Sequence, residues 1–255
     1  MRALPEENDF AKFVLDIGNG SLNDNNDNIN LNVPDECISY NFNASMEIFG
    51  NCIRDKKNSE MSKRAILSAR NVDVDEINQE VVQLLDPGGA RTHTSVNSAE
   101  NIDDNGEIAN MLLPEYLNSL NPPSLPPNKL HLRKNAIVML IQNISINESL
   151  CNGTRLRVLD LSNNLIKCKI LTGDKLGDIV FLNRITLICE DQLPFTFKRR
   201  QFPVKLAFAM TINKPQGQTF DKIGIDLRRD VFNHGQLYLA ISRVRSWDSL
   251  KIYLG

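Results

Sequence analysis

The sequence predicts an α/β fold that is interrupted by a small β-barrel, and three observations support this fold class. An apolar run at residues 65–68 is followed at once by apolar residues at helical spacing over 72–85, which is typical of an α/β unit. After residue 128 the hydrophobic period changes to two, with short strands between turn signals. The α/β pattern then returns from Val204, so we expect the barrel to be inserted into one α/β domain.

The first half of the chain is predicted to alternate helices and loops. Residues 9–17 form an amphipathic pattern that predicts a short helix, and the Asn-, Asp- and Gly-rich segment 19–32 predicts a loop. A further helix is expected over 107–120. Four prolines between residues 122 and 127 predict a stiff linker, because proline fixes φ, and this linker is the expected domain boundary.

The second half is predicted to be rich in strands. Strands are expected at 136–141, 154–161, 165–171, 179–182, 185–188, 204–210, 220–227 and 249–254, with a helix at 235–244. Alternation along the hairpin 154–171 places five side chains inside: Leu156, Val158, Ile166, Cys168 and Ile170. It places four cations outside: Arg155, Arg157, Lys167 and Lys169. These cations predict a patch that binds a nucleic-acid backbone, and an outer face that is only solvated remains the alternative.

Composition bounds the class of protein. With 42% hydrophobic and 24% charged residues, the chain is expected to be soluble and globular. Its longest apolar run, residues 136–141, is far shorter than the roughly 20 residues of a membrane span. The five cysteines include no C-x-x-C pair, which indicates reduced thiols and no zinc site. We therefore expect an intracellular protein without membrane contact, and without a resident metal of its own.

Charge is distributed unevenly. Residues 1–128 hold 9 Lys and Arg against 21 Asp and Glu, whereas residues 129–255 hold 20 against 10. The basic half is the candidate for contact with phosphate, and two ordinary solvated faces are the alternative. The three histidines, His93, His131 and His234, lie in different segments and are expected at the surface or in loops.

Two polar stretches carry the candidate chemistry, since the chain contains no Gly-Lys pair and hence no P-loop. The first is Thr211-Ile-Asn-Lys-Pro-Gln-Gly-Gln-Thr219, which follows an apparent buried strand. In open α/β sheets ligands bind at that end, and Lys214 could supply charge to a phosphate. The second is the stretch 235–245, on whose predicted helix Gln236 and Arg243 are expected to lie together on a face away from the buried stripe. A surface arginine and a polar loop without function are the alternatives.

Together, residues 202–220 and 234–245 resemble the fifth and sixth conserved motifs of superfamily-one DNA helicases. The similarity is greatest to the Pif (petite integration frequency) family, especially the helicase part of Helitron transposon proteins. Residues 150–155 with 198–203 resemble that family's inserted, SH3-like "2B" barrel. Residues 65–85 resemble the start of its second RecA-like domain. The resemblance implies a linker at 1–60, the RecA-like domain 2 at 61–128 and 201–255, and the 2B barrel at 129–200.

The resemblance also implies roles for individual residues. Arg243 matches the arginine that reaches the γ-phosphate of ATP, and Arg70 is a candidate for the fourth motif's phosphate contact. Gln216, Gly217 and Gln218 match the loop that couples nucleotide state to DNA, and Gln236 would join the nucleotide site. Thr211, Asn213 and Lys214 would face the backbone of single-stranded DNA. Pro215 departs from the family, which usually has a small residue there, and proline removes a backbone donor.

The resemblance therefore implies the C-terminal part of an ATP-dependent DNA helicase that moves 5′ to 3′. The family's first RecA-like domain carries the phosphate-binding lysine and would hold most of the ATP and Mg²⁺. The implied partners are single-stranded DNA and duplex junctions, with a monomeric state and, in a eukaryote, a nuclear location. The implied processes are DNA replication, repair, recombination and telomere maintenance. A nucleic-acid-binding remnant without catalysis is the main alternative, and an unrelated interaction protein is a third reading.

Overall fold

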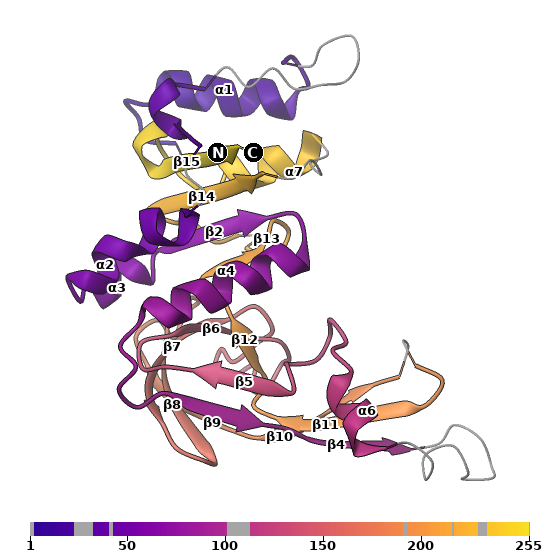
Figure 1. The fold of residues 1–255 in the computed structure, drawn as a ribbon. Coiled ribbons are helices and arrows are strands. Elements are labelled where there is room, and N and C mark those ends of the chain that lie inside the picture. The colour runs from indigo at the N-terminus through magenta and orange to yellow at the C-terminus, as the bar shows by residue number, and fades with distance from the viewer. Residues whose placement is uncertain are drawn as a thin grey trace. The chain divides into compact units, whose positions relative to one another are not determined.

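In the computed structural model of the chain, the described residues are 3–22, 33–40, 43–100, 113–190, 193–215, 217–228 and 234–254. They form two compact units (Figure 1). The parallel-sheet unit contains Met1–Leu84 and Ala207–Gly255, and the antiparallel unit contains Leu85–Leu206. The predicted α/β fold with an inserted β domain is confirmed. None of the helices in these ranges is both long enough and apolar enough to cross a membrane.

The parallel-sheet unit is built on five strands in the order β1-β15-β14-β2-β13, all of which run parallel. The strands are β1 (Ile38–Ser39), β15 (Leu250–Leu254), β14 (Lys222–Leu227), β2 (Arg64–Ser68) and β13 (Ala209–Thr211). The central strands are apolar because helices and loops bury both faces of a parallel sheet, as the burial of β2 from its second residue onward shows.

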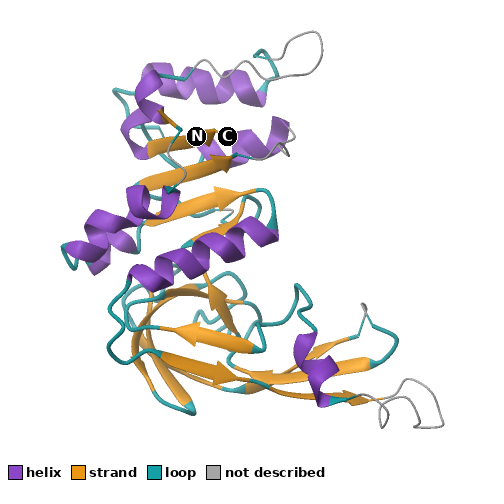
Figure 2. Cartoon of the chain, in the orientation of Figure 1, coloured by secondary structure: helices purple, strands orange, loops and turns teal. Residues whose placement is uncertain are grey.

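Helices complete this unit (Figure 2). They are α1 (Asn8–Gly18), α2 (Asn51–Arg54), α3 (Asn58–Met61), α4 (Asn71–Leu84) and α7 (His234–Ile241), with a π-helical turn at Met46–Gly50 and 3-10 turns at Asp35–Cys37 and Trp247–Ser249. Helix α4 packs on β13 and β2, and α1 packs on α7. Two phenylalanines of α1 also contact Trp247, with ring centroids 5.1 Å and 4.9 Å away.

The antiparallel unit contains two sheets and a strand pair. The five-stranded sheet has the order β12-β6-β7-β8-β9, and the three-stranded sheet has the order β10-β11-β4. Strands β3 and β5 form the pair. Their bounds are β3 (Arg91–Thr94), β4 (Val96–Glu100), β5 (Lys129–Leu132), β6 (Ile137–Leu140), β7 (Arg155–Leu161), β8 (Leu165–Ile170), β9 (Ile179–Asn183), β10 (Ile185–Cys189), β11 (Thr196–Gln201) and β12 (Val204–Leu206). Helix α6 (Pro114–Ser119) lies against β4.

The units divide the chain at positions other than those the sequence predicts. Residues 85–128 belong to the antiparallel unit, because β3 and β4 pair with β5 and β11 there. The proline-rich segment is packed rather than linking, since Leu125 is buried in the core beside β10 and β11. Much of the expected linker 1–60 is folded into the parallel-sheet unit as α1, β1, α2 and α3.

Three local expectations also differ. The single strand expected at 204–210 is two strands, because β12 pairs with β6 while β13 pairs with β2 in the other unit's sheet. The helix expected over 107–120 is seen as α6, which begins at Pro114; residues 101–112 lie outside the described ranges, as do 23–32 of the expected loop. His93 is buried on β3 rather than exposed.

Candidate nucleotide and nucleic-acid site

The carboxyl ends of the parallel strands meet at one edge of the sheet. Register places Ser68, at the end of β2, beside Thr211 of β13 on one side and Asp226 of β14 on the other. The segments that follow these strands contain Arg70, the loop 211–219 and Arg228. Ligands of open α/β sheets bind outside this edge, so the structure gathers cationic and polar groups where a ligand is expected.

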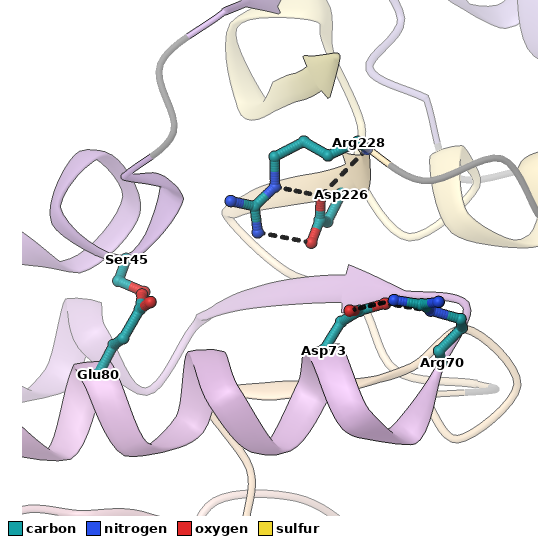
Figure 3. A network of polar contacts seen from close by, with 6 residues as sticks. All are labelled: Ser45, Arg70, Asp73, Glu80, Asp226 and Arg228. Atoms are coloured by element: carbon teal, nitrogen blue, oxygen red, sulfur yellow. Dashed lines mark hydrogen bonds and ion pairs between the residues drawn. The ribbon is translucent and has the colours of Figure 1, made fainter. Parts of the chain in front are cut away.

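Two guanidinium–carboxylate pairs stand at this edge (Figure 3). Arg70 donates from Nε and Nη2 to the two carboxylate oxygens of Asp73, at 2.7 Å each. Arg228 binds Asp226 in the same two-pronged way, at 2.7 Å and 2.9 Å. The hydrogen bonds that each arginine donates to its carboxylate raise the pKa of that arginine above its ordinary value. Arg70, the expected phosphate contact, is therefore held in place by a carboxylate of the first turn of α4 (Figure 3).

The loop 211–219 is shaped by backbone turns. The backbone amide of Lys214 donates to the carbonyl of Thr211 at 2.9 Å, and the backbone amide of Gln218 donates to the carbonyl of Pro215 at 3.0 Å. Asn213 and Lys214 are exposed, as contact with a DNA backbone would require, whereas Pro215 is buried. Gly217 has a φ of 80°, which explains a glycine at this position. Gln216 lies outside the described residues.

Arg243 lies beyond α7, which ends at Ile241, and not on the helical face expected for it with Gln236. Its half-buried guanidinium donates from Nε to the carbonyl of Leu239 at 2.9 Å and from Nη2 to Oγ of Ser242 at 2.7 Å. Nη1 lies 3.5 Å from the carbonyl of Pro215. The structure thus brings Arg243 onto the loop 211–219. The buried stripe predicted for this helix is confirmed at Leu237, Ala240, Ile241 and Val244.

The outer face of the β7–β8 hairpin keeps three of its four expected cations. Arg157, Lys167 and Lys169 are partly exposed, and the five predicted inner side chains are fully buried. The prediction that Arg155 is a surface cation is wrong, since only 2% of the residue is exposed and burial lowers its pKa to about 10. Arg155 pairs with Met139 of β6 and Arg157 pairs with Ile137 of the same strand, so this pairing alone does not explain why only Arg155 is buried.

Two residues at this edge of the sheet, Asn78 and Arg228, were not among the predicted site residues. Asn78 of α4 donates to the carbonyl of Ala209 at 3.0 Å, and its Oδ1 accepts from the amides of Phe208 and Ala209 at 2.9 Å each. It therefore fixes the strand from which the loop 211–219 emerges. Arg228 directly follows β14, so the rule that pointed to the loop would also have found it.

Among the described residues, no group of three or more His, Cys, Asp or Glu side chains is placed to hold a metal ion. Guanidinium groups, which are suited to phosphate binding, lie at this edge, where Arg70 and Arg228 are each paired with a carboxylate.

In comparison with known proteins, the chain is similar to one class of enzyme, the Pif1 DNA helicases. Residues 115–161 match the family described as "DNA helicase Pif1, 2B domain". The chain is 30% identical to the ATP-dependent DNA helicase PIF1 of Xenopus laevis over 76% of its own length and 29% of that protein. It is 35% identical to human ATP-dependent DNA helicase PIF1 over 54% of its length and 21% of the relative. The chain thus spans less than a third of these relatives.

Solved structures agree on the fold. The Pif1 helicase from Candida albicans superposes with a TM-score of 0.65 at 24% identity, covering 97% of this chain and 53% of that one. The Bacteroides Pif1 helicase in complex with ADP-AlF3 and single-stranded DNA gives 0.63 at 21% identity, covering 99% and 50%. These two superpositions show a shared fold, and the similarity to the Pif1 helicase family comes from the 2B-domain match and the PIF1 relatives.

Proposed function

We propose that the chain is the C-terminal portion of an ATP-dependent DNA helicase that moves 5′ to 3′ along single-stranded DNA, supplying the second RecA-like motor domain and the 2B domain. The observation that carries this proposal is the contact of Arg243 with the loop 211–219 at the carboxyl edge of a parallel sheet. We also assign the chain to the Helitron branch, on residues 202–220 and 234–245. The sequence predicted domain limits of 61–128, 129–200 and 201–255. In this proposal the parallel-sheet unit is the second RecA-like domain and the antiparallel unit contains the 2B domain.

ATP with Mg²⁺ would be held mainly by a first RecA-like domain, because this sequence has no Gly-Lys pair to build a P-loop. Arg243 would stabilise the charge that develops on the γ-phosphate, and Arg70 would add a second guanidinium. Gln216, Gly217, Gln218 and Gln236 would sense the nucleotide. Since Arg243 touches the carbonyl of Pro215, moving its guanidinium toward phosphate would disturb the loop that faces DNA.

Single-stranded DNA and duplex junctions are the proposed partners. Thr211, Asn213 and Lys214 would contact the strand's backbone from the loop. Arg157, Lys167 and Lys169 would add a sequence-independent attraction on the β7–β8 hairpin. The proposed enzyme works as a monomer, in the nucleus where the host is a eukaryote, in the replication, repair, recombination or telomere maintenance of DNA.

The test is to fuse the chain to a first RecA-like domain from a relative and to assay both hydrolysis and unwinding. We expect ATPase stimulated by single-stranded DNA, and unwinding of duplexes with a 5′ tail but not a 3′ tail. The 255-residue chain alone should show no ATPase above background. DNA binding by the fusion without any ATPase would instead support the alternative, a binding remnant without catalysis.

A further inference from the structure

Two neighbouring strands of the parallel sheet are followed by the same kind of side chain. Ser68 of β2 and Asp226 of β14 are register partners, and Arg70 and Arg228 each lie two residues beyond them. Because neighbouring parallel strands reach the carboxyl edge together, the two arginines emerge at neighbouring positions of this edge. Ligands of open α/β sheets bind there, so Arg228 stands where a ligand is expected.

Each arginine at this edge belongs to an ion pair whose carboxylate is the less exposed member. The side chain of Asp226 is 5% exposed and that of Arg228 is 27% exposed. The other pair is alike, with 10% for Asp73 and 38% for Arg70. Figure 3 shows that two hydrogen bonds fix each guanidinium group on its carboxylate. Both guanidinium forks are therefore held in a defined orientation while their side chains reach solvent.

Stability does not explain the pair at the end of β14. Taking a carboxylate and a guanidinium out of water costs free energy that their attraction barely offsets, and apolar residues of similar volume often stabilise a protein as well or better. Ile223 and Ile225, earlier in the same strand, are such buried apolar residues. The specific effect of Asp226 is to fix the guanidinium of Arg228 at the carboxyl edge.

The two ion pairs also act on one another. Besides the hydrogen bonds to its own carboxylate, the charge of Asp226 raises the pKa of Arg70. In the same way, besides its own partner, the charge of Asp73 raises the pKa of Arg228. The pairs are therefore close enough to interact through space, which favours one ligand for both guanidinium groups.

We propose that Arg228 is a phosphate-binding residue, which contacts the phosphates of a nucleoside triphosphate together with Arg70 while Asp226 holds its guanidinium in position. The inference rests on the proposed function for the choice of a nucleotide as ligand. A guanidinium suits phosphate because its planar fork can donate two parallel hydrogen bonds. Nε and Nη2 of Arg228 donate to Asp226, so a phosphate would compete for the other edge of the fork.

Carboxylates limit the strength of this site. Asp73 and Asp226 balance the charges of the two arginines, and a further carboxylate of the network, Glu80, accepts a hydrogen bond from Ser45 at 2.6 Å (Figure 3). A free anion should therefore bind weakly. A nucleotide held by a first RecA-like domain would meet Arg228 at a high effective concentration.

The experiment measures binding of inorganic tripolyphosphate and, separately, of oligo-dT by the full 255-residue chain at low salt. The main variant combines Asp226→Asn with Arg228→Gln, which keeps the net charge and leaves no unpaired buried charge. Its tripolyphosphate affinity should fall by about tenfold, because the charge-assisted hydrogen bonds of the fork are lost. Its affinity for oligo-dT should be unchanged, because a nucleotide and not the DNA backbone is the proposed source of the phosphate.

A second variant separates binding from support of the fold. Arg228→Lys keeps a positive charge opposite Asp226, and it should still bind tripolyphosphate at least about threefold more weakly, since a point charge cannot reproduce the planar fork. The matched control combines Arg54→Gln with Asp55→Asn, which removes two opposite charges from exposed positions at the end of α2 in the same unit. This control should leave tripolyphosphate affinity unchanged.

Unchanged tripolyphosphate affinity in the double variant of Asp226 and Arg228 overturns the inference, because Arg228 would then only neutralise Asp226. The absence of tripolyphosphate binding by the unchanged chain at low salt also overturns it. An equal loss of affinity for oligo-dT overturns it too, because Arg228 would then serve the DNA backbone. Failure of the proposed function would appear elsewhere, as a chain that binds tripolyphosphate through Arg228 but whose fusion to a first RecA-like domain hydrolyses no ATP.

Discussion

His93 should make the antiparallel unit lose stability in mild acid. Its ring is 3% exposed on β3 and contacts the ring of Phe202 at a centroid distance of 4.9 Å, edge to face. Burial, together with the charges of Arg184 and Arg91, lowers the pKa of this imidazole to about 4. The folded protein therefore keeps His93 neutral at a pH where the unfolded chain binds a proton.

The direction of this pH dependence follows from proton binding by the folded and unfolded states. Because the folded pKa lies below the unfolded value of 6.5, the unfolded state gains protons first as pH falls. Stability is unaffected above about pH 7 and decreases between about pH 6.5 and pH 4. For this shift, moving from pH 7.5 to pH 5 should cost about 2 kcal/mol of unfolding free energy.

The assay is urea unfolding at pH 7.5 and pH 5 for the unchanged chain and for His93→Gln, which cannot titrate. Comparing the pH effect in each protein cancels any loss that the substitution itself causes. The acid penalty should shrink by about 2 kcal/mol in His93→Gln. His131→Gln, an exposed histidine on the adjacent strand, should keep the full penalty. An unchanged penalty in His93→Gln would refute the claim that His93 is buried in its neutral form.

Two further substitutions test what stabilises each unit internally. Arg199→Met should destabilise the antiparallel unit by more than about 3 kcal/mol in thermal unfolding, because the fully buried guanidinium donates to the carbonyls of Pro126 and Leu120. The control is Arg200→Met at the exposed next position, which should cost less than about 0.5 kcal/mol. Asn78→Ala should cost about 2 kcal/mol or more of unfolding free energy and should speed hydrogen exchange at the amides of Phe208 and Ala209, which lose their acceptor. The control is Gln79→Ala, at an exposed position of the same helix. Equal protection of these two amides in both variants would show that Asn78 does not hold this strand.

Local signals predicted the regular elements well. Helix α4 and strand β2 were predictable because helical spacing and an apolar run are properties of adjacent residues. Strands β3, β4 and β11 were not predicted, because they are polar and owe their pairing to distant partners. The division of 204–210 into two strands also depends on tertiary pairing, since β12 and β13 join different sheets.

The candidate site was predictable in part. The rule that ligands bind at the carboxyl ends of parallel strands identified the loop 211–219, and the structure places Arg70 at the same edge. Alternation gave the correct parity of the hairpin but could not show that Arg155 is buried, because burial depends on residues distant in the sequence. The contact between Arg243 and Pro215 joins residues 28 positions apart, so no local pattern contains it.

The most direct test of the central claim is ATP turnover by the fusion with a first RecA-like domain, compared for Arg243, Arg243→Ala and Arg243→Lys. Turnover should fall by about 10³-fold or more in Arg243→Ala, and lysine should rescue it poorly because a point charge cannot reproduce the planar fork. Nucleotide affinity should change little, and the melting temperature should fall by only about a few degrees, as expected for a half-buried side chain. A large fall in melting temperature with near-normal turnover per folded molecule would contradict the account, because Arg243 would then hold the loop in place without acting on phosphate.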